Sequence, residues 1–474
     1  MASRGESVTT GDKKSLGVGL NWSSFYQVLI FSIFLATAFD NMDQATCSFI
    51  LNMMRMEWNL TAFTASYMPT FALLGTCVGA IFWGMIADRI GRKQALIWTI
   101  LLFSLTNLIQ FRAWSFPQFT ITCFFMGFGV GGEIPLAFTL LSEFLPARVR
   151  TQAGLVIGIL AIVVGYAFSA TSAYLLLQVV HADWRTLFLV QGAPALLVVF
   201  IRFKVPESPR YLRSKGKEEA ALAIAADVER RTGDYNPLAE TEENLHIETT
   251  RLSPLASLRT LWQNVYLRRT LGNWVFGFCI GFFEFGFIIW LPSTLKSLGF
   301  SDAKSIGYPL LLNMFAIPSA LFALYLMRRG GTKIILTLYP LIAGVLTIAL
   351  GYFLLEAVHQ TVALVLLGGG IFFFGTTLLG IFPLYSSEIY PTEVRGAGSG
   401  WSAGLTRVGS FLGPLIGGLM VDLAISARFQ FMFFGAFLLI GAAIMGLYGI
   451  QTFRKTLEQI SPSVVGAADQ ITGD

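Results

Sequence analysis

Charged residues are scarce in this chain of 474 residues, and so are cysteine and histidine. Only 13% of the residues are charged, about half the share in an average soluble domain, while 54% are hydrophobic. This composition excludes a soluble globular domain, a disordered chain and a fibre. The net charge of +5 comes from scattered loop residues rather than from a basic domain, so a nucleic-acid partner is excluded as well.

The four cysteines lie in apolar stretches and show neither a CxxC motif nor a disulfide spacing, so we expect them to be small packing residues. We therefore expect no metal site and no cofactor. The first residues lack the short apolar region and the cleavage site of a signal peptide, so the first apolar run is expected to remain as a membrane span.

Twelve long apolar runs are present instead, and each can cross a bilayer as a helix. They do not alternate with a period of two, which excludes the strands of a membrane barrel. The sequence therefore predicts an all-α membrane protein with twelve transmembrane helices. The expected helices span about 24–50, 62–87, 94–111, 116–145, 151–178, 185–203, 270–295, 304–328, 333–355, 360–387, 397–423 and 427–451.

One polar stretch divides the spans into two groups of six. It predicts an N-terminal tail (1–23), an N-terminal half (24–203), a linker with short helices (204–269), a C-terminal half (270–451) and a C-terminal tail (452–474). With the N-terminus inside, 26 Lys and Arg residues fall on the inner side and six on the outer side. The bias predicts a multi-pass protein of the cell's inner (plasma) membrane with both termini cytoplasmic. We expect a monomer.

The two halves share a motif, which indicates an internal duplication. The string SEFLPARVR follows the fourth expected span, and SEIYPTEVR follows the tenth. Both strings place a carboxylate at the end of one helix, a proline that stops it and an arginine at the start of the next helix. The matching positions, 245 residues apart, are Ser142, Glu143, Pro146, Val149 and Arg150 with Ser387, Glu388, Pro391, Val394 and Arg395.

Two further motifs, GMIADRIGRK at 84–93 and PESPRYL at 206–212, flank the first copy of this repeat. Together with the repeated string they resemble the major facilitator superfamily, on its side that includes sugar porters and synaptic-vesicle-protein-like chains. The segments FDNMD, GGEIP and RVGSFLGP resemble most those of bacterial niacin and aromatic-acid transporters. The resemblance covers nearly the whole chain, and it implies two pseudo-symmetric six-helix halves around a central cavity, with alternating access.

The chain departs from this family at one position. Many relatives carry an arginine in span 4, about four residues before the glycine that aligns with Gly127, and here Cys123 occupies that position. A coupling role of that arginine cannot be transferred to this chain.

Four acids and one base lie within the expected spans, where each charge is costly. The acids are Asp40, Asp43, Glu133 and Glu284, and the base is Arg407. If all were ionised, the interior would carry a net negative charge that a dry cavity cannot hold. We therefore predict that these acids carry protons during transport, with hydrogen bonding or helix capping as the structural alternative.

Arg407 is the strongest candidate for a substrate ligand, because its planar guanidinium binds a carboxylate through two parallel bonds. The alternative is a structural pair with one of the four acids. The other expected substrate-binding residues are Asp40, Tyr67, Tyr166, Glu284, Trp290, Asn313 and Trp401.

Charged residues at the cytoplasmic ends of the spans are gate candidates, although they can also serve only to stabilise loops. They are Asp88, Arg89, Arg92, Glu143, Arg150, Glu388 and Arg395.

These residues and the resemblance predict a proton-coupled carrier of a small organic acid, for example an aromatic carboxylate such as nicotinate, and not an enzyme. The expected partners are the small-molecule substrate, protons and the lipid bilayer. Two alternatives stay open. The first is a carrier of an organic cation or a sugar, coupled or uniport, which the surplus of acids and the sugar-porter motif also suit. The second, from another functional class, is a channel or a transporter-like sensor.

Overall fold

The structure is a computed structural model that describes residues 23–233, 259–353, 361–391 and 394–452. The tails and the middle of the linker lie outside these ranges, as do the side chains of a few residues within them, including Arg150. In the described ranges the chain is helical and forms no strand, as the composition and the long apolar runs predict.

The N-terminal half contains six spans. The first four are α1 (Ser24–Glu57), α2 with α3 (Ala62–Ala65 and Tyr67–Ile90), α4 (Arg92–Gln110) and α5 (Phe116–Phe144). The fifth is α6 continued by a π-helical turn, η1 (Ala147–Ala173 and Tyr174–Val179), and the sixth is α7 with α8 (Thr186–Gln191 and Ala195–Lys204).

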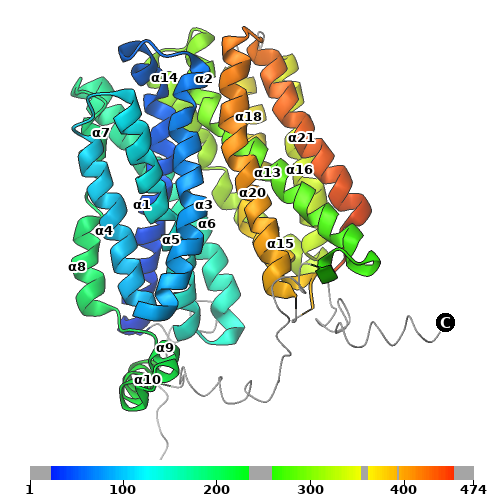
Figure 1. Cartoon of the computed structure of the whole chain (residues 1–474). Helices are drawn as coiled ribbons and strands as arrows, with labels where there is room; N and C mark the ends of the chain where they lie inside the picture. The colour runs from blue at the N-terminus through cyan, green and yellow to red at the C-terminus, as the bar shows by residue number, and fades with distance from the viewer. Residues whose placement is uncertain (1–22, 234–258, 354–360, 392–393, 453–474) are drawn as a thin grey trace, which may run out of the picture.

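The C-terminal half repeats this arrangement. Its spans are α13 (Asn264–Ser297), α14 with α15 (Asp302–Asn313 and Ala316–Gly330), α16 (Thr332–Tyr352), α18 with α19 (Thr361–Gly375 and Leu378–Glu388), α20 (Arg395–Asp422) and α21 (Ala427–Tyr448). Two clusters of buried apolar side chains form the core, one mainly in each half, and Figure 1 shows the two halves as separate bundles.

Among the described residues, eleven spans are long and apolar enough to cross a membrane by hydropathy alone. The twelfth, α4, opens with the polar residues Arg92, Lys93 and Gln94, which lower its mean hydropathy. It nevertheless packs along α5 inside the bundle, and its 19 residues extend over about 28 Å. The twelve-helix fold predicted from the sequence is therefore confirmed.

Glycines allow the helices of each half to approach closely, because a Cβ atom would strike the neighbouring backbone. A Cβ on Gly127 of α5 would collide with the carbonyl oxygen of Ala72 on α3. In the C-terminal half, a Cβ on Gly409 of α20 would collide with the carbonyl oxygen of Phe278 on α13. The glycine-rich segments thus serve helix packing.

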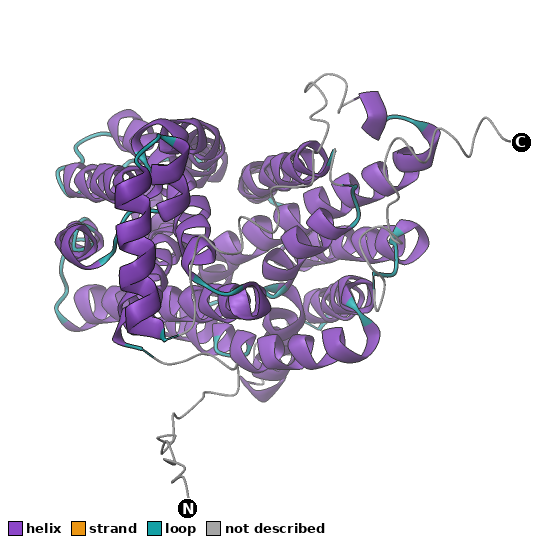
Figure 2. Cartoon of the chain, turned by 90° about the horizontal axis from the view of Figure 1, so that it is seen from below, coloured by secondary structure: helices purple, strands orange, loops and turns teal. Residues whose placement is uncertain are grey.

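Two short linker helices, α9 (Pro209–Ser214) and α10 (Glu218–Thr232), lie under one end of the N-terminal half. We call this the linker end and the opposite end the far end (Figure 1). Gly91 makes the tight turn from α3 to α4 at the linker end with a φ of 106°, and a Cβ there would collide with the Glu207 carboxylate. Figure 2 views the molecule from the linker end and shows that its described elements are helices joined by short loops.

Candidate functional site

The two halves are hydrogen-bonded to each other toward the far end. The Asp422 carboxylate, at the end of α20, accepts bonds from the backbone N–H groups of Ala62 and Phe63 at 2.7 and 2.8 Å. The Thr70 hydroxyl of α3 donates to the carbonyl of Phe411 on α20 at 3.3 Å. At the linker end, no hydrogen bond or ion pair between described residues joins the halves, and their ribbons diverge there (Figure 1). The far end is therefore the closed end in this conformation.

Three of the four predicted acids come together in the middle of the N-terminal half. Asp40 and Asp43 lie on one face of α1, and Glu133 of α5 lies within electrostatic range of both. All three side chains are buried. Gln44 donates to Asp40 at 3.3 Å, whereas neither oxygen of Glu133 has a hydrogen-bond partner in the structure. Three adjacent buried carboxylates cannot all be ionised, because the one base within electrostatic range, Arg407 near Asp40, cannot offset three negative charges.

Asp43 has an amide as its partner rather than a base. The Asn107 side chain of α4 donates to both oxygens of Asp43, at 3.1 and 2.9 Å. Cys123, which stands where many relatives carry arginine, lies close to this group and receives a 3.5 Å contact from the Gln110 amide. The departure seen in the sequence therefore leaves Asp43 hydrogen-bonded and without a neutralising cation.

Arg407 lies on α20, in the C-terminal half, and its side chain is partly buried. Its guanidinium is within electrostatic range of two groups of the N-terminal half, the Asp40 carboxylate on α1 and the Cys77 thiol on α3. Among the described residues it forms no ion pair and no hydrogen bond. Arg407 and Asp40 thus approach each other across the interface between the halves without a direct salt bridge.

Glu284 lies apart from the three-acid cluster, on α13 of the C-terminal half. It is next to the buried Phe283, and no hydrogen bond or ion pair to a described residue is found for it. A small cavity of about 20 Å³ lies nearby, between α13 and the N-terminal half, with Asp43, Gln44 and Phe285 among its lining residues. This volume holds about one water molecule.

The structure separates the predicted aromatic and amide ligands. Trp290 is buried and donates its indole N–H to the carbonyl of Pro414 at 2.9 Å, so it fixes α13 against α20. Tyr166 packs edge-on against Phe49, and Tyr67 lies against Phe63. Asn313 is buried at the end of α14, whereas Trp401 is 49% exposed and packs on Trp274. No common pocket holds these residues in this conformation, and their substrate-binding roles stay predictions.

Four of the predicted gate residues lie at the linker end of the N-terminal half. Arg92 contacts Asp88 at 3.7 Å and Glu143 at 3.5 Å, which connects α4 to α3 and α5. The backbone carbonyl of Arg89 accepts a hydrogen bond from the Tyr211 hydroxyl at 2.8 Å. These contacts all stay within one half, so they stabilise its loops, and they leave the Asp88 carboxylate 76% exposed.

The equivalent residues of the C-terminal half have different partners. The Arg395 side chain donates to the carbonyl of Tyr390 at 3.4 Å, and Glu388, at the end of α19, lies near Thr452. Arg150 starts the span that follows Glu143, but its side chain lies outside the described part of the chain. A gating role for these residues stays a prediction.

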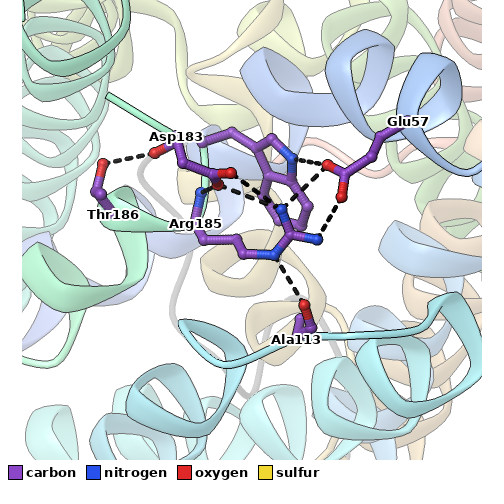
Figure 3. Close-up of polar contacts among 6 residues, drawn as sticks. Glu57, Ala113, Asp183, Arg185 and Thr186 are labelled. Atoms are coloured by element: carbon purple, nitrogen blue, oxygen red, sulfur yellow. Dashed lines mark hydrogen bonds and ion pairs between the residues drawn. The ribbon is translucent and has the colours of Figure 1, made fainter. Parts of the chain in front are cut away.

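A polar cluster that the sequence analysis missed closes the far end of the N-terminal half (Figure 3). Arg185 binds both oxygens of Glu57, at 2.6 and 3.1 Å, and also contacts Asp183 and the carbonyl of Ala113. The Trp184 indole donates to Glu57 at 2.6 Å. The hydrogen bonds to Glu57 raise the pKa of Arg185 above its ordinary value. The only sequence signal was an acid at the end of one span and a base before another.

Two six-helix halves that meet at one end, with ionisable side chains near mid-membrane depth at their interface, are the architecture of a secondary transporter. Comparison with known proteins agrees with this class. The chain matches the family described as "Sugar (and other) transporter" over residues 24–463. The chain belongs to this family, part of the major facilitator superfamily, and it is a multi-pass membrane transporter rather than an enzyme.

Two similar proteins come from Acinetobacter baylyi. The niacin transporter NiaP is 31% identical over 92% of this chain and 96% of its own length. The 4-hydroxybenzoate transporter PcaK is 28% identical over 84% of this chain and 86% of its own length. A solved structure of the xylose transporter XylE from E. coli is 18% identical and matches with a TM-score of 0.73. The match covers 92% of this chain and 100% of the XylE chain, so the two proteins share a fold.

Proposed function

We propose that this transporter moves a small organic acid, for example an aromatic carboxylate such as nicotinate, by alternating access and in symport with protons. One observation carries the proposal. Arg407 approaches Asp40 across the interface between the halves, yet it has no ion pair or hydrogen bond among the described residues. An arginine left unpaired at this depth is costly unless a ligand pairs with it.

A substrate carboxylate supplies that partner. The guanidinium of Arg407 offers two parallel N–H donors to the two oxygens of the anion. Since Arg407 belongs to one half and its neighbours Asp40 and Cys77 to the other, a substrate bound to Arg407 contacts both halves. This is where a substrate must sit if it is to favour rocking of one half against the other. The niacin and 4-hydroxybenzoate transporters among the relatives carry aromatic acids, which supports this substrate class.

The buried acids provide the proposed proton coupling. Glu133 is buried without a hydrogen-bond partner and Asp40 is paired only through one oxygen, so this conformation tolerates them best in the protonated form. Opening the far end brings water to the cluster and allows the protons to exchange. Asp43 and Glu284 are further candidates, the first through its Asn107 contacts and the second at its separate position on α13.

We further propose that the linker end faces the cytoplasm of the cell that carries this protein in its inner membrane. The excess of Lys and Arg at this end supports the orientation. The far end then faces outward, and the structure represents a conformation closed to the outside. The proposed functional unit is the monomer, because the predicted site lies between the two halves of one chain.

Uptake of labelled nicotinate into proteoliposomes tests the proposal. We expect accumulation under an imposed inward proton gradient, loss of accumulation with a protonophore, and competition by benzoate but not by nicotinamide. Uptake that ignores the gradient would contradict symport. Competition by an organic cation or by xylose instead of benzoate would favour the alternative substrate classes, a cation or a sugar.

A further inference from the structure

A large cavity of about 710 Å³ opens at the far end, above the closure between the halves. Its walls come from the end of α1 and the following loop, from the end of α13, and from the turn between α20 and α21. Both halves therefore contribute to it. It is separate from the three-acid cluster and from Arg407, none of which lines it.

The cavity wall carries positive charge and no negative charge. Arg55 of α1 and Lys296 of α13 line it, whereas none of its lining residues is Asp or Glu. Asp422, which does not line the cavity, lies within electrostatic range of Arg55; its carboxylate accepts from the N–H groups of Ala62 and Phe63 and forms no ion pair with Arg55. The Arg55 side chain forms no ion pair or hydrogen bond with a described residue, and its Nε is buried without a partner.

A second unsatisfied group lies in the same wall. Ser293 of α13 is only 8% exposed, and its hydroxyl has no hydrogen-bond partner in the structure. A buried hydroxyl and a buried guanidinium N–H without partners are both costly, and an anion with two oxygens satisfies such donors. Asn52, Thr294 and Gln430 add neutral polar groups to the wall.

We propose that this cavity is a peripheral binding site for small organic carboxylates, with Arg55 as its charged anchor and Ser293 as a hydroxyl donor. The inference rests on the proposed function, because the carboxylates are those that the transporter carries. The site concentrates the anion at the closed far end, before the halves open toward the central site. Attraction by a positive cavity wall raises the rate at which an anion reaches the site, and salt weakens this attraction.

The test measures nicotinate uptake into proteoliposomes with the far end outside, at low and high ionic strength. We expect Arg55→Gln to raise KM about fivefold to tenfold at low salt, with an unchanged maximal rate, because it removes the attraction. High salt should raise the wild-type KM toward that of the variant. Arg55→Lys should keep a KM near the wild-type value, and Ser293→Ala should raise KM by a smaller factor.

Arg112→Gln is the matched control, because Arg112 is exposed in the loop before α5 and does not line the cavity. It should behave as the wild type at both salt concentrations. A KM and a salt dependence that are the same in wild type and Arg55→Gln would overturn the peripheral site. Absence of nicotinate uptake by the wild type would instead contradict the proposed function, so the two failures are distinguishable.

Discussion

Replacing Asp422 by Ala should shift the protein away from the conformation closed at the far end. Asp422 caps the N-terminus of α2 across the two halves through two hydrogen bonds of 2.7 and 2.8 Å. These bonds must break when the far end opens, because their donors and acceptor belong to different halves. The carboxylate therefore stabilises only the closed arrangement.

The magnitude follows from the geometry. A hydrogen bond to a charged group contributes about 1.5–3 kcal/mol. Asp422 is exposed to solvent, which weakens each bond, so we expect a total of about 2 kcal/mol. Its loss lowers the ratio of far-end-closed to far-end-open molecules about thirtyfold.

Distances between spin labels measure this shift. The labels replace two exposed residues at the far end, His181 in the N-terminal half and Phe353 in the C-terminal half. In Asp422→Ala we expect a larger fraction of long distances than in the wild type. Asp183→Asn is the control, because it changes a far-end carboxylate that pairs with Arg185 inside one half. An unchanged distance distribution in Asp422→Ala would refute the closing role of this carboxylate.

Two further predictions concern the N-terminal half. Glu133→Gln removes an acid that is buried without a hydrogen-bond partner. It should abolish nicotinate accumulation driven by a proton gradient, while exchange of internal for external nicotinate continues. Loss of both activities would argue for a structural role of Glu133. Arg185→Gln breaks the two bonds to Glu57 and should destabilise the protein by about 2 kcal/mol, seen as a lower Tm, while the KM for nicotinate is unchanged. An unchanged Tm would contradict a stabilising role of the Arg185–Glu57 pair.

The helices could be predicted from the sequence because bilayer thickness demands long apolar runs, and such runs are visible without any tertiary information. Even α4, whose polar start lowers its mean hydropathy, is predictable from the apolar run that begins at Ala95. The turn at Gly91 was predictable for a related reason, since a backbone with positive φ favours glycine.

The partners of the polar residues could not be predicted in the same way. Asp422 ends one span and Ala62 starts another, 360 residues away, and only the packing of α20 against α2 and α3 brings them together. The Arg185–Glu57 pair likewise joins the end of α1 to the start of α7, and their approach depends on tertiary packing. The departure at Cys123 is visible in the sequence, whereas no motif marks Asn107 as the residue that binds Asp43 in place of a base.

The mid-span charges were predictable as a group because each is costly in a bilayer, but their grouping was not. The structure brings Asp40, Asp43 and Glu133 together and leaves Glu284 on its own. Trp290 shows the limit of predicting cavity residues from residue type alone. Its indole N–H donates to the backbone carbonyl of Pro414, and the residue lines the far-end cavity rather than a central site.

Binding of nicotinate and nicotinamide to the wild type and to variants of Arg407 tests the central claim most directly, with Tm measured on the same samples. If Arg407 holds the substrate carboxylate, Arg407→Ala should weaken nicotinate binding about 30-fold or more, and Arg407→Lys should also weaken it because the planar fork is lost. Binding of the neutral amide should change little, and Tm should stay near the wild-type value. An equal loss for both ligands, with a large fall in Tm that Asp40→Asn restores, would contradict the claim and make Arg407 a structural partner of Asp40.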